Sequence, residues 1–439
     1  MKQRKSIHFI GVGGIGMSAL AQYCVKFGME VSGSDRQDSE MLHHLKDLGV
    51  KVFVGHKASN IGRAQVVVYT SAVHFDNEEL QAALKTGVKV MSRSEMLGWI
   101  VSGFTTSVAI AGTHGKTTVT SMLSDVFYRM GLLHTAFIGG EGSHGNFVSG
   151  GDTVVAEACE YQRSFLELKP TVGVVLNVEY DHPDCYDNMT ELYKAFRKFC
   201  NGSQQVLING DDKFSETIPN ALTFGLGNNN LYRAVDIRCD KGLYRYTFVT
   251  GDIAVDVRLS VVGRHQVYNS LAVMSVCHIL GLPLLQCGKA LSHFGGTHRR
   301  WERFSDNPFN LIADYAHHPT EIQSSVDTAL QCGCNKLWVV FQPHTYSRTK
   351  ALMKQFARSL SKADGVALLP VYSARESVDK SADSDSLVRL MSNGMLVHSF
   401  NDAVNWVNDN AREGDTVLLL GAGDVCELAQ LIVKQQDVR

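Results

Sequence analysis

Short apolar runs alternate with segments of helical spacing along most of this chain. The runs end in glycine or polar residues, which is typical of buried strands followed by turns into helices. We expect strands at residues 6–10, 29–32, 50–54, 66–69, 88–91, 107–111, 154–157, 173–178, 311–314, 337–341, 365–369 and 416–420. Helical segments lie between them, for example at 17–27 and 266–280. This alternation predicts an α/β protein whose parallel sheets are covered by helices on both faces.

One stretch departs from this pattern. Residues 224–262 alternate apolar and polar positions, which predicts an antiparallel excursion. The chain has 439 residues, more than one hydrophobic core usually supports, so about three domains are expected. Turn-rich segments near 102–106 and 305–308 suggest the boundaries. The predicted domains are 1–104, 105–307 and 308–439.

Composition excludes several classes of protein. The chain is 44% hydrophobic and 20% charged, with a net charge of −2, so there is no bulk electrostatic case for nucleic acid or an anionic membrane. No apolar run approaches the roughly 20 residues of a membrane span. The basic start, Met1 to Lys5, precedes a glycine-broken stretch that fits a strand better than a signal peptide. Ten cysteines without zinc-type pairs favour reduced, mostly buried thiols in a cytoplasmic protein.

The most specific stretch predicts a strand, a glycine turn and a helix start at 107–123. Its turn reads Gly112-Thr113-His114-Gly115-Lys116-Thr117-Thr118. Backbone N–H groups of such a turn bind phosphate oxygens, Lys116 suits the β- and γ-phosphates, and the Thr117 hydroxyl suits Mg²⁺. Ile110 stands where the usual motif has its first glycine, so the loop is a shortened variant. The alternative, a turn without a ligand, fits the Gly-Lys-Thr-Thr sequence less well.

A second glycine loop follows the first predicted strand. Its glycines are Gly11, Gly13, Gly14 and Gly16. Asp35 follows the next predicted strand, 29–32, about 20 positions past the glycines, where an acidic residue commonly contacts a ribose hydroxyl. A tight turn without a ligand remains an alternative. The residues do not decide between a nicotinamide dinucleotide and another diphosphate nucleotide.

Two strands of the central domain end in polar residues, where open α/β sheets bind ligands. Glu157 ends one strand and is the better candidate for a Mg²⁺ ligand, whereas Glu160 is interpreted as a solvated charge at a helix start. His182 lies in the polar cluster after another strand and is a second candidate metal ligand.

The C-terminal domain has two histidine-rich strand exits, at 314–321 and 342–349. Together they suggest a polar substrate pocket. Helix capping by Thr320 and Glu321 explains part of the first exit but not its paired histidines. The pair Arg299-Arg300 either clamps a phosphate or forms a solvated turn.

These motifs, taken together and in this order, resemble the Mur ligase family, and most closely its members that join L-alanine to UDP-N-acetylmuramate. The resemblance covers nearly the whole chain. It implies a three-domain enzyme of peptidoglycan precursor synthesis: a Rossmann-like N-terminal domain, a central P-loop ATPase-like domain and a Rossmann-like C-terminal domain. It further implies ATP and Mg²⁺ as cofactors, and small-molecule substrates without nucleic acid or membrane insertion.

The resemblance also implies roles for individual residues. Lys116, Glu157, His182 and Arg348 would be catalytic, with Thr117, Glu157 and His182 at the metal. The ATP site would be Gly112, Thr113, His114, Gly115, Lys116, Thr117, Thr118, His265 and Asn269. The UDP-sugar site would be Gly11, Gly13, Gly14, Gly16, Asp35 and Ser71. The amino-acid pocket would be Tyr315, His317, His344 and Arg348.

The implied reaction converts the muramoyl carboxylate to an acyl phosphate, which the amine of alanine attacks. Two departures from the family pattern concern its sites: Gln266 where Asn is frequent, and Thr345 where Arg is frequent. Lys194 and Lys198 lie near the position of a carbamylated lysine in sister ligases, and neither is assigned. The oligomeric state and the preference among alanine, glycine and serine are left open.

Three alternatives remain at this point. The first is a ligase of wall recycling that attaches a ready-made peptide to the same UDP-sugar. The second is a nicotinamide-dependent oxidoreductase, which leaves the phosphate loop, Glu157 and His182 unexplained. The third is a non-catalytic nucleotide-binding regulator.

Overall fold

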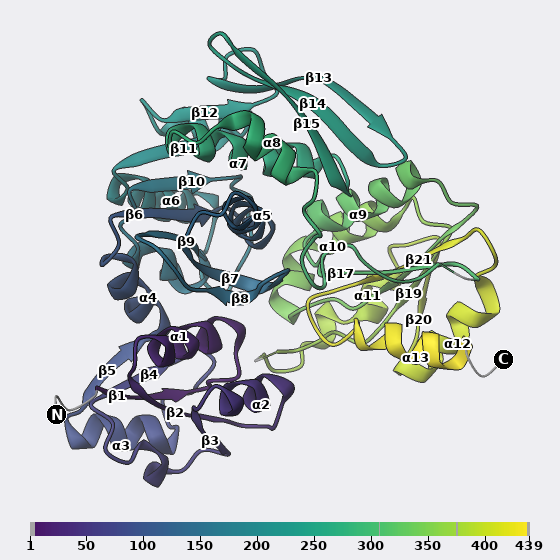
Figure 1. Cartoon of the computed structure of the whole chain (residues 1–439). Helices are drawn as coiled ribbons and strands as arrows, with labels where there is room; N and C mark the ends of the chain where they lie inside the picture. Colours follow the sequence, from purple (N-terminus) through teal and green to yellow (C-terminus); the bar gives the residue numbers. More distant parts are fainter. Residues whose placement is uncertain (1–4, 307, 375, 437–439) are drawn as a thin grey trace. The chain divides into compact units, whose positions relative to one another are not determined.

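The computed structural model describes residues 5–306, 308–374 and 376–436. The chain forms two compact units. Unit 1 comprises the chain up to Leu176 together with 194–208 and 215–222, and unit 2 comprises 177–193, 209–214 and the chain from Thr223 onward. The division falls within α6 (Met189–Gly202), β11 (Gln205–Asn209) and β12 (Leu222–Gly225). Each unit alternates strands and helices, so the predicted α/β class is confirmed (Figure 1).

Unit 1 begins with a parallel sheet in the order β3-β2-β1-β4-β5. The order reverses between β1 and β4, and ligands of such sheets bind in the crevice beyond the carboxyl ends of the strands at that point. The strands are β1 (Ser6–Ile10), β2 (Glu30–Asp35), β3 (Lys51–Val54), β4 (Val66–Tyr69) and β5 (Lys89–Ser92). The helices are α1 (Ile15–Lys26), α2 (Glu40–Asp47), α3 (Glu78–Thr86) and α4 (Arg93–Val101).

Unit 1 also holds part of a second sheet, in the order β11-β10-β6-β9-β7-β8. These strands are parallel except for β8, which forms an antiparallel hairpin with β7. The strands are β6 (Thr106–Ala111), β7 (Thr135–Gly142), β8 (Gly145–Val148), β9 (Thr153–Glu157), β10 (Val172–Val175) and β11 (Gln205–Asn209). The helices are α5 (Lys116–Arg129) and α6 (Met189–Gly202), and a 3₁₀ segment covers Tyr161–Glu167.

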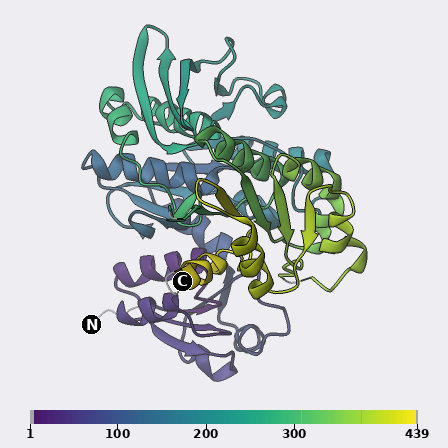
Figure 2. The ribbon, with the colours of Figure 1, turned by 90° about the vertical axis from the view of Figure 1, so that its right-hand side faces the viewer.

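Unit 2 contains the predicted excursion, which is antiparallel from β13 to β15. Its inner face packs apolar side chains against α7 and α8, and its outer face is polar, as the alternation predicts. Figure 2 shows these strands as a long teal ribbon. The elements are β12 (Leu222–Gly225), β13 (Tyr232–Asp240), β14 (Leu243–Thr250), β15 (Ile253–Val262), α7 (His265–Ile279) and α8 (Leu284–Leu291).

The rest of unit 2 is a sheet in the order β16-β17-β21-β18-β19-β20, with β16 as its antiparallel edge. One hydrophobic cluster packs α12 and α13 on one face, and another packs α9, α10 and α11 on the other, so the central strands are apolar throughout. The strands are β16 (Glu302–Ser305), β17 (Asn310–Asp314), β18 (Leu337–Phe341), β19 (Gly365–Leu368), β20 (Gly394–Leu396) and β21 (Thr416–Leu420). The helices are α9 (Pro319–Cys332), α10 (Tyr346–Leu360), α11 (Ser384–Val388), α12 (Phe400–Asn410) and α13 (Glu427–Gln436).

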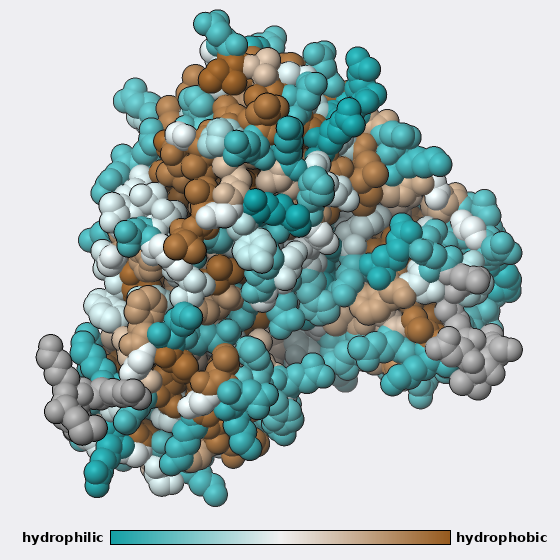
Figure 3. Space-filling view, in the orientation of Figure 1, coloured by the Kyte–Doolittle hydropathy of each residue, from teal (hydrophilic) through white to brown (hydrophobic). Residues whose placement is uncertain are grey.

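All ten cysteines are free thiols, but only Cys24, Cys200, Cys277 and Cys287 are fully buried, so the expectation of mostly buried thiols is wrong. Among the described residues, no helix is both long and apolar enough to cross a bilayer. On the face shown in Figure 3, hydrophilic and hydrophobic residues are interspersed.

Candidate active site

The phosphate loop of unit 1 follows β6, a strand flanked on both sides in its sheet. Gly112 (φ 140°) and Gly115 (φ 85°) adopt backbone conformations that favour glycine, and Gly115 is the N-cap of α5. The turn begins directly after β6, so Ile110 is a buried strand residue rather than part of the loop. The Nζ of Lys116 folds back and donates to the carbonyl oxygens of Gly112 (2.6 Å) and Thr113 (3.0 Å).

Lys116 is also paired with Glu160, at 2.8 Å from Nζ to Oε2. Glu160 is only 1% exposed, so its interpretation as a solvated charge is wrong. Burial by itself opposes the charged ammonium, but the Glu160 carboxylate, with smaller contributions from Cys159 and Glu157, raises the pKa of Lys116. The lysine is therefore a fixed positive charge inside the loop. The short spacing between Glu157 and Glu160 indicated nothing of this contact.

Glu157 and Thr117, two of the predicted metal ligands, lie together. Glu157 ends β9 and pairs with Ile110 of β6, which directs it toward the loop. Its Oε2 accepts hydrogen bonds from Thr117 Oγ1 at 2.8 Å and from the N–H of Gly139 at 3.0 Å. A Cβ at Gly139 would lie 2.2 Å from that oxygen, so any larger residue would displace the carboxylate from this position. A hydroxyl beside a carboxylate is an oxygen donor set of the kind that Mg²⁺ prefers.

The glycine loop follows β1 at the reversal of strand order. Gly11 has φ 84°, and a Cβ there would lie 2.5 Å from the Thr70 side chain beyond β4. Gly14 is the N-cap of α1, and the N–H of Gly13 donates to Asp35 Oδ2 at 2.9 Å. Asp35 thus supports the loop itself. Ser71 lies exposed in the turn after β4.

A cavity of about 280 Å³ connects these two regions of unit 1. Residues from the glycine loop, from the turn after β4 and from the end of β9 all contribute to its lining. They include Gly14, Gly16, Thr70, Arg93, Glu157 and Cys159. Arg93 begins α4 beside Gly16, a cation that the sequence analysis did not single out. The cavity is therefore bounded by the glycine loop at one side and by the candidate metal carboxylate at another.

In unit 2, Arg348 forms a buried pair with Asp181. Its Nε donates to Oδ1 at 2.7 Å and its Nη2 to Oδ2 at 3.2 Å, and both residues are 4% exposed. Burial alone would raise the pKa of Asp181, but Arg348 and then His182 hold it well below its usual range. The fork predicted to bind the carboxylate of an amino acid is thus already bound by a carboxylate of the chain. Asp181 lies in the polar cluster of His182, where no local sequence pattern indicates its partner.

His182 is close to the same pair. It has a positive φ of 56°, its N–H donates to Asp181 Oδ1 at 2.8 Å, and its Nε2 lies 3.7 Å from Oδ2. A histidine in this backbone conformation is uncommon and is held by its surroundings.

The remaining predicted pocket residues cluster at the exits of β17 and β18. Arg348 Nη1 lies 3.2 Å from His344 Nδ1, and the His344 and His317 rings are 6.0 Å apart between centroids. The Tyr315 and His317 rings are 5.2 Å apart. Burial lowers the pKa of His317 to about 3, so this ring is neutral at neutral pH. Unit 2 thus brings together Tyr315, His317, His344 and Arg348.

Arg299 and Arg300 pack against this cluster. Their guanidinium groups lie 5.0 and 4.8 Å from the centroid of the Tyr315 ring, and Arg299 Nη2 donates to the carbonyl oxygen of Gly423. Cations over an aromatic face are stabilising. The solvated-turn interpretation of this pair is therefore wrong.

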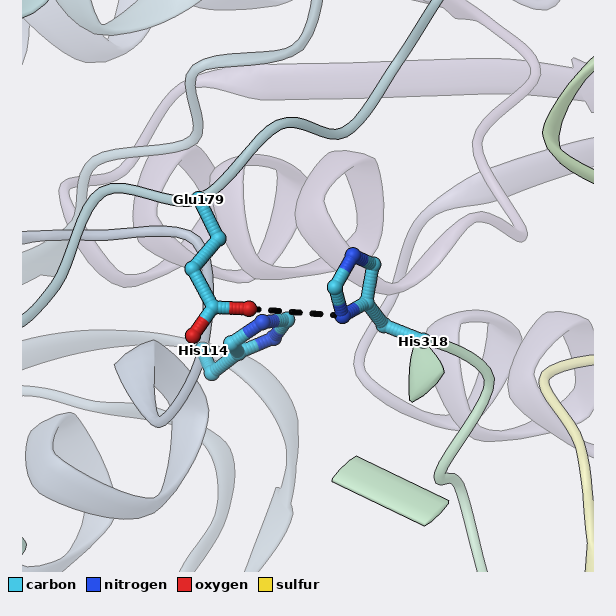
Figure 4. Close-up of side chains that lie close together, drawn as sticks. All are labelled: His114, Glu179 and His318. Atoms are coloured by element: carbon cyan, nitrogen blue, oxygen red, sulfur yellow. Dashed lines mark ion pairs between the residues drawn. The ribbon is translucent and has the colours of Figure 1, made fainter. Parts of the chain in front are cut away.

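His318 explains part of the paired-histidine motif. It is the N-cap of α9, where its Nδ1 accepts from the N–H of Thr320 at 3.3 Å. Its ring also approaches Glu179, at 3.6 Å from Nδ1 to Oε2 (Figure 4). Thr320 Oγ1 donates to the same carboxylate at 2.5 Å. Capping therefore involves one of the two histidines, contrary to the expectation from sequence.

His265 and Asn269 are linked through Gln266. Nε2 of His265 lies 3.0 Å from Nε2 of Gln266, whose Oε1 accepts from Asn269 Nδ2 at 3.0 Å. Burial lowers the pKa of His265 to about 4. A separate hollow of about 520 Å³ in unit 2 is lined by residues that include Glu179, Tyr180, Asp211, Lys213 and His318.

Comparison with protein families places this geometry in context. The model described as "Mur ligase family, catalytic domain" matches residues 6–105, "Mur ligase middle domain" matches 110–277, and "Mur ligase, glutamate ligase domain" matches 299–423. The chain belongs to the Mur ligase family. The resemblance drawn from the motifs is confirmed, and the oxidoreductase alternative is wrong. The glycine loop lies within the family's N-terminal model and the phosphate loop within its middle model.

Individual members of the family match over their full length. The UDP-N-acetylmuramate–L-alanine ligases of Clostridium perfringens and Clostridium beijerinckii are 38% and 39% identical, each comparison covering 98% of both chains. The crystal structure of UDP-N-acetylmuramate-alanine ligase from Thermotoga maritima is 30% identical with a TM-score of 0.85, covering 99% of both chains. A murein peptide ligase from Psychrobacter arcticus shares the fold at 21% identity and a TM-score of 0.76.

Proposed function

We propose that this chain is an ATP-dependent ligase that joins L-alanine to the carboxylate of UDP-N-acetylmuramate and releases ADP and phosphate. One observation carries the proposal most strongly. The cavity of unit 1 is bounded both by the glycine loop and by Glu157, which is hydrogen-bonded to Thr117 of the phosphate loop. A substrate held at the first loop can therefore extend its far end toward a phosphate held at the second.

Each substrate has a proposed domain. UDP-N-acetylmuramate binds in domain 1–104, ATP in domain 105–307 and L-alanine in domain 308–439. The UDP-sugar residues are Gly11, Gly13, Gly14, Gly16, Asp35 and Ser71. The ATP residues are 112–118 with His265 and Asn269. The alanine pocket is formed by Tyr315, His317 and His344, with Arg348 beside them and paired to Asp181. We expect the enzyme to act in the cytoplasm, where its free thiols would stay reduced.

Mg²⁺ is proposed at Thr117 and Glu157, with His182 as a further ligand. The oxygen pair of Thr117 and Glu157, 2.8 Å apart, fits the ion. When bound, Mg²⁺ would neutralise the charge of the phosphate oxygens.

The chain's own residues supply positioning and charge. A carboxylate oxygen of UDP-N-acetylmuramate attacks the γ-phosphorus, the bond to the β-phosphate oxygen breaks, and ADP leaves. Lys116 stabilises the phosphate charge during this step. The neutral amine of alanine then attacks the acyl carbon of the acyl phosphate. The carbon–oxygen bond to phosphate breaks, and the amide forms with loss of a proton from nitrogen. Holding the reactants in line and excluding water from the acyl phosphate are the main tasks of the site.

A coupled ADP-release assay tests the function. ADP release should require UDP-N-acetylmuramate and an acceptor together, with L-alanine preferred over glycine, serine and the tripeptide that a recycling ligase uses. Lys116→Ala should abolish release while retaining calorimetric binding of the UDP-sugar. The proposal would be overturned by ADP release when UDP-N-acetylmuramate or the acceptor is left out. It would also be overturned by ADP release with the tripeptide but not with L-alanine.

A further inference from the structure

Asn146 of β8 makes three side-chain hydrogen bonds, all to α1. Its Nδ2 donates to the carbonyl oxygen of Ile15 at 2.7 Å and to Ser18 Oγ at 2.9 Å, and its Oδ1 accepts from Gln22 Nε2 at 3.0 Å. The three partners lie on one face of α1, which begins at the glycine loop. Asn146 is 4% exposed, so its amide has exchanged water for these partners.

Aromatic packing supports the same contact. The Tyr23 ring of α1 lies 5.8 Å from Phe137 of β7 and 6.2 Å from Phe147 of β8, between ring centroids. Phe137 and Phe147 are themselves 5.4 Å apart. Such contacts add to the burial energy of the rings and restrict how α1 can move on the hairpin.

The other side of the hairpin contacts α5, which begins at Lys116. His144 Nε2, at the turn, lies 3.3 Å from Asp125 Oδ1, and the His144 ring lies 3.9 Å from that of Tyr128. Gly142 lies so close to Ser121 that a Cβ would be 2.5 Å from its Oγ. The β7–β8 hairpin therefore contacts both the helix of the glycine loop and the helix of the phosphate loop.

The hairpin also borders the reaction site. Phe137, Ile138 and Gly139 of β7 line the cavity of unit 1, and the N–H of Gly139 donates to Glu157. A shift of α1 on the hairpin would thus change the distance from the glycine loop to Glu157 and the phosphate loop.

We propose that Asn146 is a positioning residue that sets the glycine loop relative to the phosphate loop. This inference rests on the proposed function, in which the glycine loop binds UDP-N-acetylmuramate, the phosphoryl acceptor, and the phosphate loop binds ATP, the donor. Asn146 contacts neither reactant in this account. Removing the Asn146 side chain should therefore slow the chemical step without weakening the binding of either nucleotide, because a misplacement of about 1 Å can cost about 100-fold in rate.

The test compares Asn146→Ala with Asn393→Ala in the full chain. Asn393 is the control because its Nδ2 likewise donates two hydrogen bonds, here to the backbone carbonyl oxygens of Leu360 (3.2 Å) and Ala363 (2.8 Å), and it lies on neither α1 nor the β7–β8 hairpin. For each protein, kcat is measured by ADP release, the dissociation constants of UDP-N-acetylmuramate and ATP by calorimetry, and Tm by thermal unfolding.

We expect kcat of Asn146→Ala to fall by roughly 10- to 100-fold with both dissociation constants near wild type, and Asn393→Ala to keep wild-type kcat at a comparable loss of Tm. Ser18→Ala, a milder change that removes one partner, should show a smaller loss of kcat and serves if Asn146→Ala does not fold. Wild-type kcat in these α1-contact variants, or a loss of kcat matched by Asn393→Ala, would overturn the inference. An inactive wild-type chain would instead refute the proposed function.

Discussion

Glu160 and Lys116 form a buried ion pair inside the phosphate loop. Removing one member of such a pair leaves an uncompensated charge and costs about 3–5 kcal/mol. We expect Glu160→Gln to lower Tm without ATP and to regain much of it when ATP is added, because the phosphates replace the lost negative charge. The ATP-induced rise in Tm should exceed that of wild type. The exposed Glu167→Gln is the control. An equal loss of Tm with and without ATP would contradict this account.

The bidentate contact between Arg348 and Asp181 gives a second prediction at this scale. Because the guanidinium fork is occupied, the geometry favours a positioning role for Arg348 over direct contact with alanine. Arg348→Lys should then lose one of its two charge-assisted hydrogen bonds to Asp181 and shift the neighbouring side chains. The expected loss of kcat/KM is roughly 10- to 100-fold, because a misplacement of about 1 Å can cost about 100-fold in rate. The loss should be similar with alanine and with hydroxylamine, a nucleophile without a carboxylate. A much larger loss with alanine would instead support the direct contact expected from sequence.

These residues show where sequence reasoning stops. The residue types at strand ends identified Glu157, Lys116 and Arg348 as candidates, because phosphate and metal chemistry restricts the choice of side chain. Their partners were not identified, since Asp181 and Arg348 lie 167 positions apart. Nor does a local pattern reveal that a carboxylate such as Glu160 is buried against a cation.

At the scale of elements, His318 as the N-cap of α9 predicts a stability change. His318→Ala should lower the free energy of unfolding by about 1 kcal/mol. His318→Asn should lower it much less, because Asn is a favoured N-cap residue. Urea unfolding curves measure the difference. Equal destabilisation by both variants would mean that the ring's contacts to Glu179 and Tyr180, rather than its capping bond, stabilise the helix.

Strands were the most predictable elements. The ranges 66–69, 337–341 and 416–420 agree with β4, β18 and β21, because strands buried on both faces are continuous apolar runs. The β7–β8 hairpin was not anticipated. Its glycines and polar residues lack a clean alternation, and its position depends on contacts with α1 and α5 that are remote in sequence.

At the scale of the whole molecule, buried neutral histidines predict acid sensitivity. Burial holds the pKa of His317 at about 3 and that of His265 at about 4, below the ordinary 6.5. In the unfolded chain both rings bind a proton below about pH 6.5. The unfolded state therefore binds more protons than the folded state, and the free energy of unfolding decreases as the pH is lowered. Each contribution is complete above pH 6.5 and is lost progressively down to the folded pKa.

Between pH 7 and pH 5, the free energy of unfolding should therefore decrease by about 2 kcal/mol less in His317→Asn than in wild type. The exposed His43→Asn is the control and should follow wild type. Denaturant unfolding at both pH values gives the comparison. Parallel pH dependence for His317→Asn and wild type would mean that His317 binds a proton equally in both states.

The fate of the carboxylate oxygen tests the central claim most directly. UDP-N-acetylmuramate carrying ¹⁸O in its muramoyl carboxylate is incubated with the enzyme, ATP, Mg²⁺ and L-alanine, and the released phosphate is analysed by mass spectrometry. If the carboxylate attacks the γ-phosphorus and phosphate later leaves from the acyl carbon, each phosphate carries one oxygen from the labelled carboxylate. Unlabelled phosphate, formed while the alanyl product accumulates, would contradict the acyl-phosphate route.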